Sequence, residues 1–213
     1  MTGRTPLLIL GAGDFAVEAA DIAEQTGLYE VAGFVQNLDP TQRGAQLAGL
    51  PVYWVEEISA FTETHKAICA IGSAERRGLV EAVAAHGFRF ATVVHPSAVV
   101  SPRSQIEEGC LVSPGVVIGA CTRVGRQSIV NRGALVGHHV EIGEYATIGP
   151  GANIAGSCRI GKEVFLGMGA VIRDHLTLGA RAFLGAGVIA TKHVEEGGRL
   201  LAPHPISARR AGA

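Results

Sequence analysis

Two adjacent histidines, His138 and His139, are the side chains of this sequence best suited to acid–base chemistry. An imidazole exchanges a proton near neutral pH, so it can act as a general base toward an amine or a hydroxyl group. His138 is the second residue after Val136, an aliphatic residue of a regular repeat, and this register predicts an outward-facing corner. Because surface histidines are commonly inert, the repeat alone leaves the role of His138 open.

Residues 18 positions away from His139 suggest two other chemistries. Cys121 precedes His139 by that spacing, which would suit a metal site, but two ligands are too few for zinc, and His175 lies twice as far beyond. Ser157 follows His139 by the same spacing and has the chemistry of a nucleophile, but no acidic residue is placed to orient a base beside it. We therefore expect no metal and favour a histidine base.

A six-residue repeat runs without a break from Val94 to about Glu195. Small or branched side chains follow each repeating aliphatic residue after four positions, from Ala98 to Val194, and glycine often follows it directly. A period of six matches neither an amphipathic helix nor an alternating strand and is typical of a solenoid of short strands. The aliphatic series consists of Val94, Val100, Ile106, Val112, Ile118, Val124, Val130, Val136, Ile142, Ile148, Ile154, Ile160, Leu166, Ile172, Leu178, Leu184 and Ala190.

The repeat also predicts which residues of successive coils lie side by side. Three sides complete one coil in known solenoids of this period, so residues 18 apart should stack about 4.8 Å from each other, the spacing of strands in a sheet. Gly156 follows His138 by 18 residues. Its backbone N–H is therefore expected one coil beyond the base, where it can meet a developing oxyanion. The steric demands of a corner explain this glycine equally well.

Length and composition limit the remaining possibilities. The chain has 213 residues, a formal net charge of −1 and no Lys/Arg-rich run, which argues against nucleic acid as the main partner. No apolar stretch approaches the roughly 18 residues of a membrane span, and the start has too short an apolar run for a secretory signal. We expect a cytoplasmic protein without membrane insertion. Its cysteines, Cys69, Cys110, Cys121 and Cys158, are expected to be free thiols.

Residues 1 to about 90 alternate short apolar strands with helices. This alternation predicts a small parallel sheet in an α/β, Rossmann-like domain. We expect strands at Pro6–Leu10, Tyr29–Val35, Val52–Val55 and Phe90–Val94, an apolar segment at Ala67–Gly72, and helices at Val17–Gln25 and Ala74–Ala85.

A glycine-rich turn, Gly11-Ala12-Gly13-Asp14-Phe15-Ala16, connects the first strand to the first helix. Its glycines let the backbone approach a phosphate or ribose, and free N–H groups at a helix start favour an anion. After the second strand the chain gives Gln36-Asn37, where a nicotinamide dehydrogenase has an acidic residue for the ribose. A nucleotide attached to some other substrate fits better, and a tight turn without a ligand is the alternative.

These features together resemble the nucleotide-sugar N-acetyltransferases, a family of hexapeptide-repeat acyltransferases. Its members make N-acetylated 4-amino-4,6-dideoxy sugars such as bacillosamine and perosamine and include sialic acid O-acetyltransferases. The resemblance covers nearly the whole chain and rests on the glycine-rich turn, Ala70-Ile71-Gly72-Ser73-Ala74-Glu75-Arg76-Arg77, His95-Pro96-Ser97-Ala98 and the repeat. It implies a Rossmann-like domain that binds the nucleotide sugar at residues 1–93, and a left-handed parallel β-helix with a C-terminal tail at 94–213. It also implies a homotrimer, with acetyl-CoA in the groove between neighbouring solenoids.

The resemblance implies site residues as well. The family's catalytic histidine lies in a segment similar to residues 136–143, which places it at His138, and the family has asparagine at the position of Asn131. The candidate catalytic residues are His138, His139, Asn131 and Gly156. The candidate acetyl-CoA-binding residues are Gly156, Met168, Gly169, Ala170, Gly185 and Ala186, although turn geometry explains these small residues equally well. The candidate nucleotide-sugar-binding residues are Gly11, Gly13, Asp14, Phe15, Gln36, Asn37, Gly72 and Ser73.

Two positions depart from the family pattern. The residue after the catalytic histidine is commonly Asp or Glu and supports the imidazole, whereas this chain has His139. A neighbouring cation would disfavour protonation of His138, so either the base is weaker or Glu141 or Glu144 supplies the supporting carboxylate. The tail, residues 201–206, replaces the family's Gly-x-Pro-Ala-like turn.

The function that the resemblance implies is acetyl-CoA-dependent N-acetylation of a nucleotide-linked 4-amino-4,6-dideoxy sugar. Attack would be direct, with a histidine base and no covalent acyl-enzyme. A sugar O-acetyltransferase of the same fold and a non-catalytic nucleotide-sugar-binding protein are the alternatives. The loop side chains do not distinguish UDP, GDP and dTDP.

Overall fold

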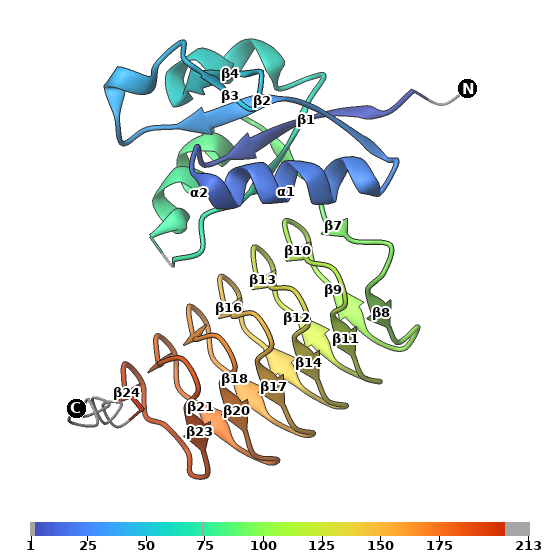
Figure 1. The fold of residues 1–213 in the computed structure, drawn as a ribbon, viewed down its shortest axis with the longest axis vertical. Coiled ribbons are helices and arrows are strands. Elements are labelled where there is room, and N and C mark those ends of the chain that lie inside the picture. Colours follow the sequence, from blue (N-terminus) through green and yellow to red (C-terminus); the bar gives the residue numbers. More distant parts are fainter. Residues whose placement is uncertain (1–2, 74, 203–213) are drawn as a thin grey trace, which may run out of the picture.

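The computed structural model describes residues 3–73 and 75–202, in which an α/β layer sits on one side of a triangular prism of short strands (Figure 1). The expected division into domains at residues 93 and 94 stays a prediction. The elements of the α/β layer are β1 (Thr5–Leu10), α1 (Asp14–Gln25), β2 (Tyr29–Gln36), β3 (Gln46–Leu47), β4 (Leu50–Trp54), β5 (Lys66–Cys69), α2 (Arg76–Ala85) and β6 (Arg89–Phe90), with short 3-10 helices at Pro40–Gln42 and Val55–Phe61.

The α/β layer is built as a Rossmann-like sheet between helices. Its strand order is β3-β4-β2-β1-β5-β6, and its pairs are parallel except for the short β3 beside β4. One apolar core packs α1 against the sheet, and a second packs α2 and the 3-10 helix at Val55–Phe61 against the other face. In the part of the chain that the structure describes, no helix has the length and apolar character needed to span a membrane.

Some element boundaries differ from those expected. Helix α1 begins at Asp14 because the extended Gly13 serves as its N-cap. The expected single strand Phe90–Val94 is wrong. Strand β6 ends the α/β sheet at Phe90, and β7 (Val93–Val94) already belongs to the solenoid, because Val93 N donates to Cys110 O at 2.9 Å. The expected helix Ala74–Ala85 is described as α2, and Ala74 lies outside the described residues.

The rest of the described chain forms a left-handed parallel β-helix with three faces. Neighbouring strands pair in parallel with an offset of 18 residues, as Leu111 does with Ile129, which confirms the predicted coil, and the last pair has a shorter offset, with Phe183 opposite Arg199. Face 1 comprises β7 (Val93–Val94), β10 (Leu111–Val112), β13 (Ile129–Val130), β16 (Thr147–Ile148), β19 (Phe165–Leu166), β22 (Phe183–Leu184) and β24 (Arg199–Leu200). Face 2 comprises β8 (Val99–Val100), β11 (Val117–Ile118), β14 (Leu135–Val136), β17 (Asn153–Ile154), β20 (Val171–Ile172) and β23 (Ile189–Ala190). Face 3 comprises β9 (Gln105–Ile106), β12 (Arg123–Val124), β15 (Glu141–Ile142), β18 (Arg159–Ile160) and β21 (Thr177–Leu178).

The interior of the prism follows the repeat. From Val112 to Ala190 every residue of the predicted aliphatic series is buried, and the three earlier ones are partly buried against the same core. Cys110 and Cys158 are buried between them, and burial raises the pKa of the Cys110 thiol to about 12. All four cysteines are free, as expected. Because both series point inward, the outward strand positions and the corners are left for contacts with other groups.

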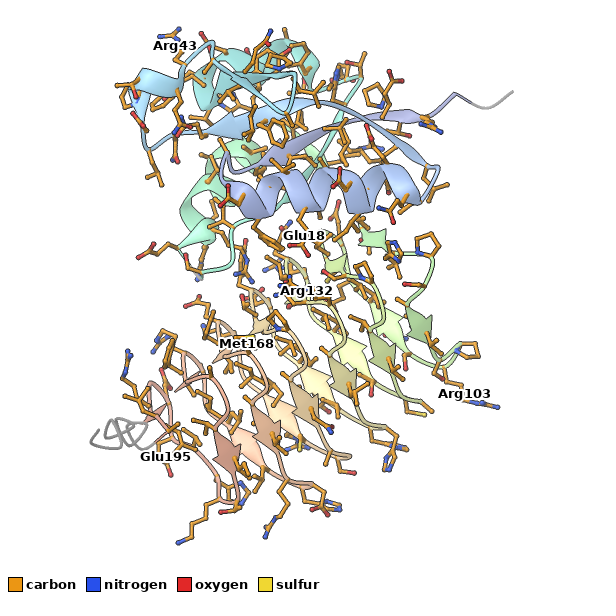
Figure 2. All side chains as sticks on the ribbon, viewed as in Figure 1. Glu18, Arg43, Arg103, Arg132, Met168 and Glu195 are labelled. Carbon is orange, nitrogen blue, oxygen red and sulfur yellow. The ribbon has the colours of Figure 1, made fainter. Side chains whose placement is uncertain are left out.

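Each face ends in a corner, and we name the corners by the faces they join: corner 1–2, corner 2–3 and corner 3–1. The outward residues Val93, Leu111 and Ile129 of face 1 are buried and belong to the same apolar core as α1. Arg132, at corner 1–2, pairs with Glu18 of α1 at 3.1 Å (Figure 2). The α/β layer therefore covers face 1, and corner 2–3 lies opposite to it.

A buried arginine joins the two parts of the chain. Arg76, in the first turn of α2, is fully buried, and its guanidinium donates to the solenoid at Tyr145 O (2.6 Å) and Ala146 O (2.9 Å). It also donates to Gln127 O, Thr147 Oγ1 and, within the α/β layer, Ser73 O. All these acceptors are uncharged, and burial lowers the pKa of Arg76. The guanidinium is thus held by a cage of neutral oxygens that spans both parts.

We predict that Arg76→Ala lowers the free energy of unfolding by about 3–5 kcal/mol, because it leaves a cavity and several buried carbonyls without donors. Urea unfolding at matched protein concentration measures this change. Arg77→Ala is the matched control, since Arg77 is the next residue of α2 but its side chain is half-exposed, with ion pairs to Glu81 and Glu163 and a guanidinium over the Tyr145 ring. Equal effects of the two substitutions would contradict the assignment.

Candidate functional site

His138 lies at corner 2–3, between β14 and β15, and its side chain is exposed. Its ring rests against Gly156, one coil further on: a Cβ added to Gly156 would lie 2.7 Å from Cε1 of His138 and 2.9 Å from Nε2. Ser157 N donates to His138 O at 2.9 Å, which joins the same two coils. The spacing of 18 residues therefore does bring His138 and Gly156 together, and Gly156 is required because any side chain there would displace the imidazole.

The backbone N–H of Gly156 is available for a ligand. Its neighbours are engaged, since Ala155 N donates to Ile172 O at 2.9 Å and Ser157 N donates to His138 O. Among the described residues, Gly156 N has no acceptor. An unpaired donor beside an exposed imidazole is an arrangement that can bind an oxyanion next to a base.

His139 lies against His138. The two Nδ1 atoms are 3.1 Å apart, and the rings meet edge to face at 84°. His139 has a left-handed backbone (φ +54), and its N–H donates to Ala120 O at 2.8 Å. These contacts fix the backbone of His139 and place the two rings together at the surface of the corner.

The structure gives the two candidate carboxylates other partners. Glu144 lies at corner 3–1 and pairs with Arg126 at 2.7 Å, while Glu141 lies on face 3 with its nearest cation, Arg159, at 3.6 Å. Neither forms a hydrogen bond to His138 in the described part of the chain. The expectation that one of them replaces the missing acidic neighbour of His138 is therefore wrong within one subunit.

Asn131, Met168, Gly169, Gly185 and Ala186 all lie at corner 1–2, not at the corner of His138. Asn131 is almost buried, and its side-chain amide donates to Ile148 O at 3.2 Å. Met168 is 61% exposed further along the same corner (Figure 2). The structure thus separates these residues from His138 within one chain.

Ala170 does not lie on the surface with the other candidate acetyl-CoA-binding residues. It is fully buried inside the prism, where it belongs to the small-residue series of the repeat. Its methyl group therefore faces the core, and a contact between its backbone and acetyl-CoA stays a prediction. The repeat turns two of every six side chains inward, and Ala170 is one of them although its neighbours Met168 and Gly169 lie at the surface of the corner.

Corner 1–2 has a glycine at its left-handed position in successive coils. Gly133, Gly151, Gly169 and Gly187 have φ between +64 and +68, and a Cβ added to any of them meets nothing within 4 Å. The same left-handed position carries His139 at corner 2–3 and Tyr145 (φ +58) at corner 3–1. Turn geometry therefore does not demand these glycines, and their effect is to keep the backbone of corner 1–2 uncovered.

A second candidate site is a cavity of about 370 Å³ at the carboxyl ends of β1, β2 and β5. Parallel sheets bind ligands at this edge. Four of the residues expected to bind the nucleotide sugar line it, namely Gly11, Gly13, Gln36 and Asn37. Gln36 is buried, and its amide is engaged inside the protein, with Nε2 donating to Asp39 O (2.8 Å) and Oε1 accepting from Asp39 N (3.0 Å). Gln36 thus shapes the loop that follows β2.

The other four expected residues border this cavity without lining it. Gly72 O accepts from Thr147 Oγ1 at 2.9 Å and Ser73 O accepts from Arg76, so both carbonyls bind inside the protein. Asp14 and Phe15 begin α1, where the acidic Asp14 makes the helix start less attractive to an anion.

Sequence reasoning missed several lining residues, including Leu38, Asp39 and Ile71. Leu38 is 85% exposed, and hydrogen bonds from Thr41 lower the pKa of Asp39. The rule that loops after parallel strands meet at one edge would have found them.

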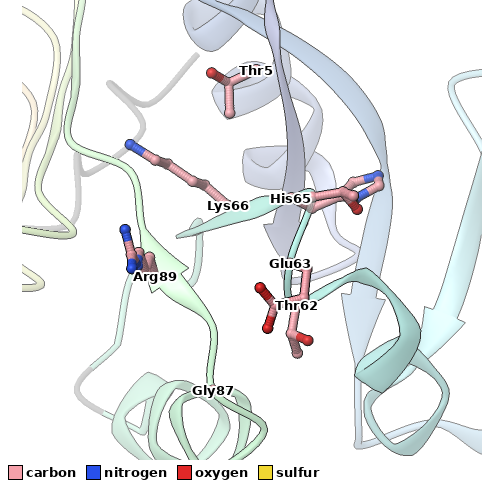
Figure 3. Close-up of a pocket in the computed structure, with 8 residues that line it drawn as sticks. Thr5, Thr62, Glu63, His65, Lys66, Gly87 and Arg89 are labelled. Carbon is pink, nitrogen blue, oxygen red and sulfur yellow. The ribbon is translucent and has the colours of Figure 1, made fainter.

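A further cavity, also of about 370 Å³, lies at the opposite edge of the sheet (Figure 3). It contains Thr5, Lys66 and Arg89, the first residues of β1, β5 and β6. Lys66 and Arg89 are register partners, so two cations stand side by side. Within residues 3–73 and 75–202, no cluster of three His, Cys, Asp or Glu side chains is placed to hold a metal ion.

Comparison with known proteins agrees with this architecture. Residues 6–81 match the family described as the PglD N-terminal domain. Perosamine N-acetyltransferase from Caulobacter crescentus, solved with CoA and GDP-perosamine as a variant with one histidine replaced by asparagine, is 29% identical, with 95% of each chain covered and a TM-score of 0.86. WeeI from Acinetobacter baumannii, at 24% identity, 93% and 97% coverage and a TM-score of 0.85, shares the fold. A comparison with curated proteins found no match.

The acetyltransferase domain of PglB from Neisseria gonorrhoeae, solved with acetyl coenzyme A, is 30% identical to this chain. The similarity covers 94% of this chain and 97% of that domain, with a TM-score of 0.84. It therefore includes the α/β layer, the solenoid and the corner that carries His138. This chain belongs to the nucleotide-sugar N-acetyltransferase family of hexapeptide-repeat acyltransferases.

Proposed function

We propose that this protein transfers the acetyl group of acetyl-CoA to the amino group of a nucleotide-linked 4-amino-4,6-dideoxy sugar, with His138 as general base. The observation that carries this proposal is the exposed His138 ring held against Gly156, in a chain similar over 95% of its length to an enzyme solved with CoA and GDP-perosamine. Two structures of that enzyme have a single histidine replaced, by asparagine or by alanine. A histidine at the centre of the chemistry is consistent with both.

The proposed reaction needs no covalent acyl-enzyme. The sugar amine attacks the thioester carbonyl while His138 removes a proton from the nitrogen, and the carbonyl oxygen becomes negatively charged. The free N–H of Gly156 stabilises that oxyanion. Collapse of the tetrahedral intermediate breaks the C–S bond and releases CoA, whose sulfur takes up a proton. The same base would also serve a hydroxyl group, so an O-acetyltransferase is the runner-up.

We infer that the active site forms between copies of the chain. Face 2 is bounded by corner 1–2 on one side and by corner 2–3 on the other. Three prisms that turn face 2 toward a common axis would bring corner 2–3 of one copy beside corner 1–2 of the next. That contact would place His138 of one copy opposite Asn131 of the next copy. It would also face that copy's left-handed glycines of corner 1–2, namely Gly133, Gly151, Gly169 and Gly187. Acetyl-CoA would then lie in the groove, with Met168, Gly169, Gly185 and Ala186 beside the pantetheine.

The side chains of face 2 support this assembly. Its outward positions carry exposed aliphatic residues except for Asn153 in β17, with Val99 64% and Ile189 65% exposed. Val117, Leu135 and Val171 continue the column at 38–44%. The equivalent positions of face 3 are polar or charged, as in Arg123 and Glu141. An exposed aliphatic column on one face of an otherwise polar solenoid is typical of a protein interface.

We predict that the wild-type protein sediments as a trimer of the 22.0 kDa chain and that Leu135→Asp shifts it toward monomer. A buried carboxylate in the apolar contact carries a desolvation cost that the interface cannot offset. Thr177→Asp on face 3 is the control and should leave the trimer intact. A wild-type protein that sediments as a monomer at micromolar concentration would contradict the proposal, as would an unchanged Leu135→Asp variant.

The reaction itself is tested by the release of free CoA thiol from acetyl-CoA. We expect release with one of the UDP-, GDP- or dTDP-linked 4-amino-6-deoxy sugars, because the relatives include an enzyme solved with GDP-perosamine. Release only with hydroxyl sugars would replace the N-acetyltransferase with the O-acetyltransferase. If the protein does not bind acetyl-CoA and no acceptor gives release of CoA thiol, a non-catalytic nucleotide-sugar-binding protein is favoured.

His138→Asn is predicted to lower kcat by roughly 10²–10⁴-fold while the KM for acetyl-CoA changes little, since it removes the base and keeps the corner. Steady-state kinetics with the preferred acceptor measures both constants. His175→Asn is the control, because His175 is an exposed histidine two coils further along the same corner. Wild-type kcat in His138→Asn would refute the assignment of the base.

A further inference from the structure

The contact between His138 and His139 requires a shared proton. A separation of 3.1 Å between the two Nδ1 atoms is a hydrogen-bond distance, and such a bond needs a proton on one nitrogen and a lone pair on the other. Two protons would collide and two lone pairs would repel. The pair therefore has two neutral arrangements, which differ in the nitrogen that carries the proton.

Only one of these arrangements leaves His138 able to accept a proton at its outer nitrogen. If His138 Nδ1–H donates to His139, then Nε2 of His138 has a free lone pair. If His139 donates instead, the proton of neutral His138 sits on Nε2, and that atom cannot act as a base. Among the described residues, Nε2 of His138 has no other hydrogen-bond partner. The direction of this one bond thus decides whether Nε2 can serve as the base.

Neighbouring coils support the His138 ring and the backbone of His139. The His138 ring is pressed against Gly156, and His139 is fixed by its left-handed backbone and its bond to Ala120 O. The contact between the two rings thus rests on a supported His138 ring and a fixed His139 backbone.

The charged and titratable groups around the pair are few. At corner 2–3, Cys121 lies one coil before His139. Asp174 and His175 lie two coils after the pair, and Lys192 and His193 lie three coils after it. Asp174 is near Arg173 (3.8 Å) and His175 (3.7 Å). Glu141 and Glu144 face arginines on other parts of the prism. In the described chain, therefore, no carboxylate accepts a hydrogen bond from His138.

We propose that His139 is a positioning residue: it accepts the Nδ1 proton of His138 and so leaves Nε2 of His138 as the base. This role rests on the proposed function for the identity of the reaction. A carboxylate in this place would accept the same proton but would add a negative charge that favours protonated His138. The imidazole of His139 sets the tautomer without that charge, and after proton transfer it binds the Nδ1–H of the imidazolium.

The first test measures the tautomers directly and does not require activity. In protein labelled with ¹⁵N-histidine, long-range ¹H–¹⁵N spectra near pH 8 should show His138 with its proton on Nδ1 and His139 with its proton on Nε2, together with a coupling between the two Nδ1 atoms. His139→Phe should abolish the coupling. A His138 protonated on Nε2 in the wild type, or the absence of any coupling, would overturn the proposal.

The second test is kinetic. His139→Phe removes the acceptor and should lower kcat by roughly ten- to a hundredfold with little change in the KM for acetyl-CoA, while His139→Gln, whose amide oxygen can accept, should retain more activity. His139→Glu should restore kcat but move the acid limb of the kcat–pH profile to higher pH, because a carboxylate stabilises protonated His138.

His175→Phe is the matched control, since His175 has the same left-handed backbone (φ +57) at the same corner, and it should leave kcat and its pH dependence unchanged. Wild-type kcat in His139→Phe, or an unshifted profile in His139→Glu, would refute the role of His139. A wild-type protein that transfers no acetyl group would instead refute the proposed function, and the tautomer spectra would still decide the role of His139.

Discussion

The guanidinium of Arg76 is the interaction on which the arrangement of the two parts depends. A buried cation is costly unless its donors are satisfied, and here carbonyls from both the loop before α2 and the solenoid turns satisfy them. The cage exists only when those segments meet. The same contacts fix the carbonyls of Gly72 and Ser73, beside the cavity at the carboxyl edge of the sheet. Arg76 therefore helps to set the position of that cavity relative to the prism, together with the apolar core that α1 shares with face 1.

A second constraint comes from the triangular cross-section. The α/β layer occupies face 1, so whatever it binds lies on the side of the prism opposite to His138. A nucleotide sugar held by one copy cannot pass through the packed interior to reach that corner. The separation of Asn131 from His138 has the same origin. Both observations become consistent with a single active site once the site is built from corners 1–2 and 2–3 of different copies.

The repeat was predictable in detail because the interior of the prism admits one pattern of side chains. Its period placed Gly156 beside His138, although the two residues are 18 positions apart in the sequence. The α/β boundaries were less predictable, since residues 90–94 are apolar except for Thr92 and nothing local marks where this segment leaves one sheet for another. The bonding of Gln36 could not be foreseen either, because its partners depend on how the loop after β2 folds back. His139 was visible in the sequence, but its hydrogen bond to His138 needed the corner geometry.

The solenoid explains why chemistry is confined to so few positions. In each coil the inward side chains fill the core and the strand backbones bond to the next coil, which leaves the middle and left-handed positions of corner 2–3 without a packing role. Non-glycine residues adopt the left-handed position at two of the corners, so that position tolerates many side chains. A histidine can therefore occupy the place next to His138, the proposed base, without disturbing the fold. The fold does not require a particular side chain at position 139. The residue there can therefore be selected for its hydrogen bond to His138.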